Sequence, residues 1–431
     1  MANYSKNLEA LKRAKQFIPA ASQVYSKSYK YFCEGAAPVF ADRGLGSHLW
    51  DIDGNEFIDT ILGLGAVTVG YNDERVNNAI RLQLEKGMSF TLPSILEAEL
   101  AETLAEIIPS AEMVKLVKNG SDATTAAVRL ARAHTGREMI LTCGYHGWHD
   151  WSIGLTEKNS GVPLAVQKLT QKFKYNDLAG LEKKLEENKN GVACVIMEPI
   201  QLEFPQSGYL EGVRALTHKH GALLIFDEVV TGFRFHIQGA QGYFNVTPDL
   251  SCFGKGMANG AAVSAVVGRR DVMRLIEEGV FISSTFGGEA LSLAAALETI
   301  AILKKPESFE KIWEMENLLL IGLNETIASL DLGSVAYTCR LPAHTALLFK
   351  PVSETVSALD IQSYFQQEVL KEGILYMGVH NFCLAHSKED MQKMIAAYSK
   401  TLKKVKEVLG SKNLENQMEG AKIRPVFTRN E

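Results

Sequence analysis

The fold is decided by three apolar runs, which read Val192-Ala-Cys-Val-Ile-Met197, Ala222-Leu-Leu-Ile-Phe226 and Leu250-Ser-Cys-Phe253. Two similar runs, Met113–Val117 and Met139–Cys143, precede them. Residues with helical periodicity lie between the runs, at 123–134, 178–187 and 211–220. Near-continuous apolar strands that alternate with helices indicate a mostly parallel sheet covered on both faces.

The alternation weakens outside this central part. Helical periodicity occurs at residues 7–17, 74–85 and 95–108, and Asp53-Gly54 predicts a hairpin. Beyond Lys304 we expect a helix at 309–327, strands at 334–340 and 346–350, helices at 360–371 and 389–408, and a mobile polar tail after Gly410. The predicted domains are a large domain at 71–304 and a smaller α+β domain formed by residues 1–70 and 305–431.

The composition narrows the class of protein. The 431 residues are 46% hydrophobic and 22% charged, with a formal net charge of -5, which is typical of a globular protein. Neither nucleic acid nor an anionic membrane is indicated as a partner. No signal peptide or membrane span is evident, and the six cysteines are scattered. We therefore expect a soluble cytoplasmic protein with reduced thiols.

Ligands of parallel sheets bind at the carboxyl ends of the strands, so the residues after each run are the candidate site. Lys118-Asn-Gly-Ser-Asp122 follows the first run and opens a helix. The free N–H groups of the helix, with Gly120 and Ser121, suit a phosphate. The alternative is an ordinary helix cap at Ser121 or Asp122.

Two further runs end in ionisable residues. Asp227 follows Phe226, and a carboxylate there can pair with a protonated ring nitrogen, or be structural or a metal ligand. Lys255 lies between two glycines, and a desolvated lysine is what imine formation needs. The alternative is a surface-loop lysine.

An aromatic residue completes the set. Tyr145, in Gly144-Tyr-His-Gly-Trp-His-Asp150, can stack on a planar ring. His146, His149 and Asp150 are alternative metal ligands, but no second cluster supports a metal site. A phosphate anchor, a stacking ring, an acid and an amine are together what pyridoxal 5'-phosphate requires.

The chain resembles the class III aminotransferases of fold type I, and most closely the branch that contains glutamate-1-semialdehyde 2,1-aminomutase. The resemblance runs from about Ile18 to Ala296 and more loosely to the end. Its motifs are Trp50-Asp-Ile-Asp-Gly-Asn-Glu-Phe-Ile-Asp59, Asn119-Gly-Ser-Asp-Ala123, Tyr145-His-Gly147, Glu198-Pro199, Phe226-Asp-Glu-Val-Val-Thr-Gly-Phe-Arg234, Pro248-Asp-Leu250, Gly254-Lys255, Ser284-Thr-Phe-Gly-Gly288 and Ala385-His-Ser387.

The resemblance implies a role for each matching residue. Lys255 would hold the cofactor as an imine and move the substrate proton, and Asp227 would hold the pyridinium proton. Val229 and Tyr145 would cover the two faces of the ring. The remaining implied contacts are to the phosphate, from Gly120, Ser121 and, across a homodimer interface, Thr285.

The departures from the aminomutase pattern concern the substrate. The stretch at residues 19–32 contains no arginine to grip a substrate carboxylate, and Leu64 replaces a tryptophan. Lysine does not reproduce the bidentate fork of arginine. The candidate substrate contacts, each of which has a surface-residue alternative, are Lys27, Tyr29, Lys30, His380 and Asn381.

Three functions remain open at this point. The first is a ping-pong aminotransferase, acting through an aldimine and a ketimine on a small amino donor and a carbonyl acceptor. The second is an isomerase, either an aminomutase or an amino-acid epimerase. The third is a silent homologue that binds the cofactor, against which the complete set of Tyr145, Asp227 and Lys255 weighs.

Overall fold

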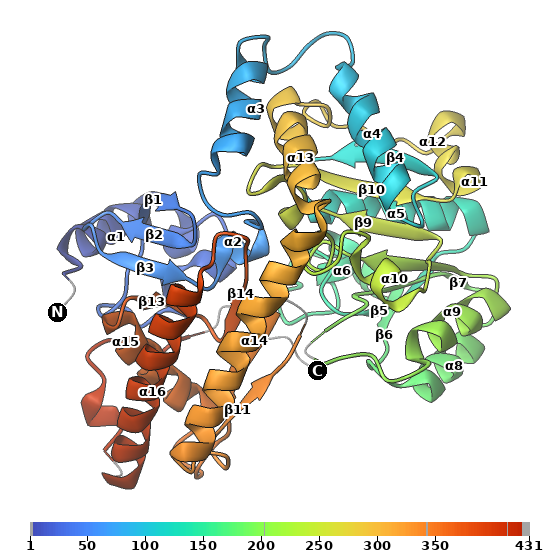
Figure 1. Ribbon diagram of the computed structural model, residues 1–431. Helices are drawn as coiled ribbons and strands as arrows, with labels where there is room; N and C mark the ends of the chain where they lie inside the picture. Colours follow the sequence, from blue (N-terminus) through green and yellow to red (C-terminus); the bar gives the residue numbers. More distant parts are fainter. Residues whose placement is uncertain (1–2, 202, 342–343, 412, 425–431) are drawn as a thin grey trace. The chain divides into compact units, whose positions relative to one another are not determined.

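The computed structural model describes residues 3–201, 203–341, 344–411 and 413–424 (Figure 1). The chain divides into two compact units. Among the described residues, unit 1 contains those of 3–65, 69–73 and 310–424, and unit 2 contains those of 66–68 and 74–309. The contacts thus divide the chain at residues 73 and 309, compared with the predicted boundaries at 70 and 304.

Unit 2 is built on a seven-stranded sheet with the order β4-β10-β9-β8-β7-β5-β6. Its strands are β4 (Met113–Val117), β5 (Met139–Cys143), β6 (Thr170–Lys172), β7 (Val192–Met197), β8 (Leu223–Asp227), β9 (Leu250–Phe253) and β10 (Ser264–Gly268). The pairs from β6 to β9 are parallel, and β10 is antiparallel to both β4 and β9. The five predicted strands and the mostly parallel sheet are confirmed.

Each face of this sheet has its own hydrophobic core. In β7, Cys194 and Ile196 belong to one core, and Val195 and Met197 belong to the other. Helix α5 (Gly120–Thr135) packs in the first core and helices α8 (Leu178–Glu187) and α9 (Tyr209–Lys219) in the second. Apolar residues are therefore needed at successive positions of the strand, which explains the continuous runs.

The other helices of unit 2 are mostly short. They are α3 (Glu74–Leu84), α4 (Ile95–Ile107), α6 (Asp150–Ile153), α7 (Leu164–Gln167), α10 (Gly239–Phe244), α11 (Arg270–Met273), α12 (Leu275–Glu278) and α13 (Ala290–Leu303), and α14 (Pro306–Ser329) continues into unit 1. Among the helices of the described residues, none combines the length and the apolar character that a membrane crossing demands.

Unit 1 joins the two ends of the chain. Its first sheet has the order β1-β2-β3-β13, from β1 (Ala41–Leu45), β2 (His48–Asp51), β3 (Glu56–Asp59) and β13 (Ile374–Leu375). Its second sheet contains β11 (Ala336–Cys339), β12 (His344–Phe349) and β14 (Val379–Asn381). The helices are α1 (Ser5–Phe17), α15 (Ala358–Lys371) and α16 (Lys388–Ser411), with one left-handed turn labelled α2 (Leu62–Gly65).

The hairpin predicted at Asp53-Gly54 is confirmed, with β2 and β3 paired antiparallel. The Asp53 carboxylate accepts hydrogen bonds from the N–H groups of Lys6 and Asn7, both at 2.9 Å. The turn therefore caps the first turn of α1, which explains why a helix with few buried residues begins here.

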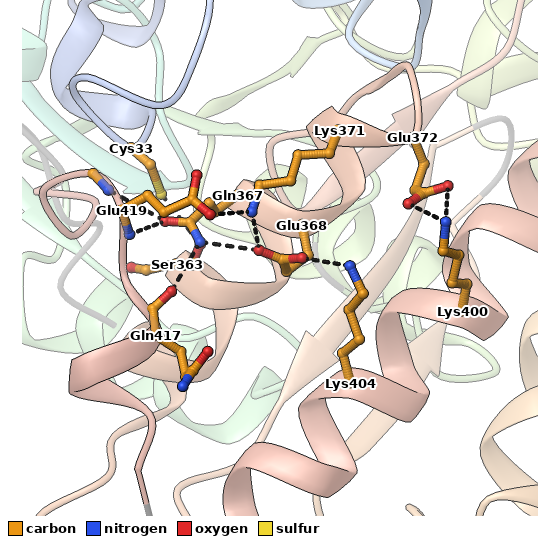
Figure 2. Close-up of polar contacts among 11 residues, drawn as sticks. Cys33, Ser363, Gln367, Glu368, Lys371, Glu372, Lys400, Lys404, Gln417 and Glu419 are labelled. Atoms are coloured by element: carbon orange, nitrogen blue, oxygen red, sulfur yellow. Dashed lines mark hydrogen bonds and ion pairs between the residues drawn. The ribbon is translucent and has the colours of Figure 1, made fainter. Parts of the chain in front are cut away.

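The prediction of a mobile tail was wrong for residues 413–424. Leu414 and Ile423 are buried, and Ala421 forms a β-bridge with Glu34. The side chain of Gln367 on α15 binds the backbone of this segment (Figure 2). The segment is mostly polar, and its two buried apolar residues, Leu414 and Ile423, are too few to be noticed in its composition. Residues 412 and 425–431 lie outside the described residues.

Asp249 links the starts of the two central strands of unit 2. Its buried carboxylate accepts hydrogen bonds from the Leu224 N–H, from Arg269 and from His218, each at 2.8 Å. Burial acts to raise the pKa of Asp249, but the hydrogen bonds from these three groups outweigh it and hold the pKa below its usual value. The ionised carboxylate therefore stabilises the folded chain.

We expect Asp249→Asn to lower the free energy of unfolding by about 1–3 kcal/mol near neutral pH, because a buried charged network loses its acceptor. This stabilisation is fully present above the pKa that Asp249 has in the unfolded chain. It is lost as the pH falls through the lower pKa that Asp249 has in the folded chain. The difference from wild type should therefore narrow between about pH 5 and about pH 3. Urea unfolding at both pH values measures this. Asp271→Asn, at an exposed partner of the same Arg269, is the control and should change stability by less than about 0.5 kcal/mol.

Candidate functional site

Two ionisable side chains lie at the same end of adjacent strands. Asp227 is the last residue of β8, and its register partner on β9 is Cys252. Lys255 comes three residues after Cys252 and begins the 3-10 turn Lys255–Ala258. Because β8 and β9 are parallel, both residues lie at the carboxyl edge of the sheet, where ligands of such sheets bind. The predicted carboxylate and the predicted amine thus follow the same end of neighbouring strands.

The backbone at Lys255 is strained. Its φ is 40°, in the left-handed region, which costs a residue with a side chain about 1–2 kcal/mol. Thr68 holds the turn: its Oγ1 donates to the Gly256 carbonyl at 2.8 Å, and its N–H donates to Asn259 Oδ1 at 3.0 Å. Strain that is held by specific contacts concentrates at functional sites, which favours a functional lysine over a surface-loop residue.

The Asp227 carboxylate is 5% exposed and is held from two sides. Oδ2 lies 2.7 Å from His146 Nδ1, and Oδ1 accepts a hydrogen bond from the Val229 N–H at 3.1 Å. An ionised carboxylate only accepts, so Nδ1 of His146 is the donor to an ionised Asp227. Nε2 is buried without a hydrogen-bond partner among the described residues, and the ring stacks on Trp151.

The loop that carries His146 is attached to the first turn of α5. Thr124 Oγ1 donates to the His146 carbonyl at 2.7 Å, and the Trp148 N–H donates to Ser121 Oγ at 3.3 Å. Gly147 has φ 101°, and a Cβ there would collide with the Ser121 side chain. Glycine therefore lets the loop approach the helix closely, and this contact fixes the orientation of His146.

The side chain of Val229 lies between two of the predicted segments. A Cβ on Gly120 would lie 2.9 Å from Val229 Cγ1, and one on Gly254 would lie 3.6 Å from the same atom. The first residue of α5, the loop after β8 and the residue before Lys255 therefore meet around one valine. This places the predicted phosphate anchor beside the predicted imine lysine.

Helix α5 does have an N-cap, as the alternative interpretation predicts, but the capping residue is not one of the two predicted. Asn119 is the N-cap and forms a capping box with Asp122, so neither Ser121 nor Asp122 is the cap. Gly120 and Ser121 instead occupy the first two helical positions, where N–H groups lack intrahelical acceptors. An anion at this helix end is favoured by those groups and by the helix dipole.

Tyr145 and Thr285 are more accessible. Tyr145 is 39% exposed, and its N–H donates to Glu198 Oε2 at 3.2 Å. Thr285 is exposed in the turn at residues 285–288, next to Phe286. The two residues are predicted to contact a ring face and a phosphate, respectively, and both remain predictions.

The candidate substrate contacts all belong to unit 1. Lys27 is exposed, Lys30 is half-buried, and Tyr29 is half-buried with the Lys15 ammonium 4.3 Å from the centre of its ring. His380 and Asn381 are buried, so the surface alternative is wrong for these two. His380 hydrogen-bonds Tyr398 and the Thr345 carbonyl through its two ring nitrogens, and burial lowers its pKa to about 3.

Three supporting residues were missed at the sequence level. They are His146 as the partner of Asp227, Thr68 as the support of the Lys255 turn, and Thr124 as the anchor of the His146 loop. The sequence pattern suggests His146 only as a metal ligand. The signal that could have identified it is its position directly after Tyr145 in a loop that follows a strand adjacent to β7. Among the described residues, no cluster suited to a metal ion is found.

The residues present fit pyridoxal phosphate. The Asp227 carboxyl group is 5% exposed and lies 2.7 Å from His146 Nδ1, so a cationic ring nitrogen would be a suitable partner for its charged form. At Gly120, a side chain would fill the space in front of Val229, as expected where a ligand approaches the backbone.

Comparison with known proteins agrees with this geometry. The model of the family "Aminotransferase class-III" matches residues 31–405. The chain is 34% identical to the 3-aminobutyryl-CoA aminotransferase of Cloacimonas acidaminovorans, over 94% of this chain and 98% of that protein. It is 36% identical to the glutamate-1-semialdehyde 2,1-aminomutase of Syntrophobacter fumaroxidans, over 92% and 96%.

A solved structure extends the likeness to the fold. The pyridoxal-phosphate form of the FumI protein of Sphingopyxis sp. MTA144 superposes with a TM-score of 0.87 at 26% identity, and covers 94% of this chain and 98% of that one. The architecture is that of the fold type I transferases, and the cofactor is pyridoxal 5'-phosphate. The chain belongs to the class III aminotransferase family.

Proposed function

We propose that the chain is a two-substrate aminotransferase whose amino donor carries no free carboxylate. The observation that carries the proposal is the absence of arginine from residues 19–32, together with the retained Asp227 and Lys255. Burying a carboxylate without a bidentate partner is costly. A β-amino acyl thioester has no such carboxylate, and a relative at 34% identity is a 3-aminobutyryl-CoA aminotransferase.

In this proposal the residues of unit 2 divide the work. Gly120, Ser121 and the first turn of α5 bind the phosphate, with Thr285 of a second copy. Val229 and Tyr145 cover the faces of the ring. The bound cofactor supplies an electron sink for the substrate carbanion.

Asp227 then keeps the proton on the ring nitrogen, and His146 holds the carboxylate in place. The amine of Lys255 would take the proton from the donor carbon and deliver it to the cofactor carbon that receives the amino group, and it would make the reverse transfer to the acceptor carbon in the second half of the cycle. The buried position of Asp227 strengthens its interaction with a cation because little water screens it.

An aminomutase is the second candidate. The 36% identity to glutamate-1-semialdehyde aminomutases favours it. Both activities use the same lysine and the same carboxylate, so the substrate contacts distinguish them. An aminomutase keeps its amino group in one cycle, whereas a two-substrate transaminase stops after one half-reaction without an acceptor.

We also propose that the functional form is a homodimer. Two segments of unit 2 carry large apolar side chains that are about half exposed or more, namely Met88, Phe90, Leu92 and Ile95 in the first and Phe281 and Phe286 in the second. The Ala290 N–H donates to the Met88 carbonyl at 2.8 Å, which joins the two segments that carry them. A patch of this kind marks an interaction surface. Thr285 is exposed and lies next to Phe286 in the chain, as expected for a residue shared across such an interface.

A cytoplasmic location is supported by the cysteines. All six are free thiols, and five of them are buried. Secreted proteins usually oxidise cysteines in pairs, whereas reducing compartments keep them as thiols.

The first prediction here concerns Lys255. The purified protein should be yellow, and Lys255→Ala should lose the visible absorption of the lysine-bound cofactor and at least about a thousandfold of turnover, because proton transfer alone contributes 10²–10⁴-fold. Absorption spectra and single-turnover rates measure this. Lys219→Ala, at a surface lysine of unit 2, is the control. An unchanged spectrum in Lys255→Ala would refute the assignment.

The second prediction concerns the amino donor. We expect 3-aminobutyryl-CoA to bleach the yellow form at least about tenfold faster than free 3-aminobutyrate. Only the free acid brings a carboxylate that would lack a bidentate partner, and a penalty of about 1.4 kcal/mol for it corresponds to a factor of ten. Stopped-flow absorbance at equal concentrations measures both rates. Equal or faster bleaching by the free acid, or sustained conversion of glutamate 1-semialdehyde without an acceptor, would contradict the proposal.

The third prediction concerns the dimer. Phe281→Glu and Phe286→Glu together should convert a dimer to a monomer and lower cofactor affinity, since charges would enter an apolar contact and Thr285 would be lost from the partner site. Sedimentation velocity and cofactor titration measure the two effects. Phe17→Glu, at an exposed phenylalanine of unit 1, should leave the dimer intact. A wild-type monomer that binds the cofactor fully would rule the dimer out.

A further inference from the structure

Residues 413–424, here called the C-terminal strap, lie against the segment that follows the candidate substrate contacts. The Ala421 N–H donates to the Glu34 carbonyl at 2.9 Å, and the Arg424 N–H donates to the Lys30 carbonyl at 2.8 Å. The Arg424 guanidinium also pairs with the Glu34 carboxylate at 2.9 Å. The strap and the segment Lys30–Glu34 are therefore bonded side by side, although nearly the whole chain separates them.

Helix α15 holds both segments through one buried polar face. Ser363, Gln366 and Gln367 are each 0% exposed and share a face at i, i+3 and i+4 spacing. Gln366 accepts from the Cys33 N–H and donates to the Tyr31 carbonyl, both at 3.1 Å.

The other two side chains of this face bind the strap. Gln367 accepts from the Glu419 N–H at 2.7 Å and donates to the Gln417 carbonyl at 3.1 Å (Figure 2). Ser363 accepts from the Ile423 N–H at 3.1 Å. Buried side-chain amides that bind backbone groups on two segments fix both, because any shift would leave a buried polar group unpaired.

These buried hydrogen bonds outweigh the ion pairs of the strap. Lys371 pairs with Glu419 at 2.7 Å, but this pair lines a solvent-open groove of about 410 Å³. Ion pairs in such surroundings contribute little. The close approach at Gly420 is a stronger constraint, since a Cβ there would lie 2.9 Å from the Glu34 carbonyl oxygen and 3.0 Å from that of Cys33.

We propose that the C-terminal strap, through Gln367, Ser363 and Gly420, positions the Tyr29–Cys33 segment for binding the amino donor. This rests on the proposed function and takes Lys27, Tyr29 and Lys30, the candidate substrate contacts of this segment, as residues that bind the donor. The residues of the strap are positioning residues and touch neither substrate nor cofactor. Loosening the strap therefore weakens donor binding and leaves the chemistry in unit 2 intact.

Two variants test the proposal in the full-length holoenzyme. Gly420→Val introduces a clash at the strap, and Gly410→Val is its matched control, since nothing lies within 4 Å of a Cβ at Gly410. Gln367→Met removes the strap hydrogen bonds at similar side-chain volume and does not depend on a clash. Donor kinetics use whichever amine bleaches the wild-type protein, and hydrogen exchange is followed at the amides of residues 30–34.

We expect Gly420→Val and Gln367→Met each to raise the donor KM at least about fivefold (about 1 kcal/mol), with kcat within about twofold of wild type. Amide exchange at residues 30–34 should accelerate, with an unchanged visible cofactor spectrum, and Gly410→Val should match wild type. Faster exchange with an unchanged KM would make the strap purely structural and overturn the proposal. Loss of the cofactor spectrum together with kcat would also overturn it. Failure of the proposed function would look different. In that case no amine donor would bleach even the wild-type protein.

Discussion

The Asp227 carboxyl group is buried at the end of a strand whose two faces are both covered by apolar cores. A charge in that position is tolerated only with matched partners, and removing a partner from a buried pair costs about 3–5 kcal/mol. His146 and the Val229 N–H supply part of the match. The rest of the site follows from this requirement, because the loop that brings His146 is bonded to α5, and Val229 contacts the first residue of α5.

Much of the fold and part of the site could be predicted, and the reasons differ between the two. The runs at β5, β7 and β9 match the strands because nearly all of their residues are buried, which favours apolar residues at successive positions. Strands β6 and β13, of three and two residues, leave too little pattern to detect. The acid and the amine were detectable because they end such runs. His146, Thr68 and Thr124 were not, because their roles depend on contacts between segments that lie far apart in sequence.

The residues that match the cofactor motifs and the candidate substrate residues belong to different units of the chain. Unit 2 holds the residues that match the family motifs for the cofactor, whereas unit 1 holds the stretch without arginine and the buried His380 and Asn381. A change of substrate therefore requires no change in the residues around Asp227 and Lys255. This division is consistent with relatives named as an aminotransferase and as an aminomutase at nearly equal identity.

The pairing of β3 with β13, and of Glu34 with Ala421, has a consequence for biosynthesis. Residues of the first strands emerge from the ribosome long before their partners, since Ile58 waits for Ile374. Contacts of such high sequence separation are slow to form, and an unpaired strand edge invites wrong pairing in the meantime. Unit 2 has its sheet within residues 113–268 and can complete it first. The amino-terminal segment of the nascent chain is thus exposed to wrong pairing, which chaperones counter, until residues 374 and 421 have been synthesised.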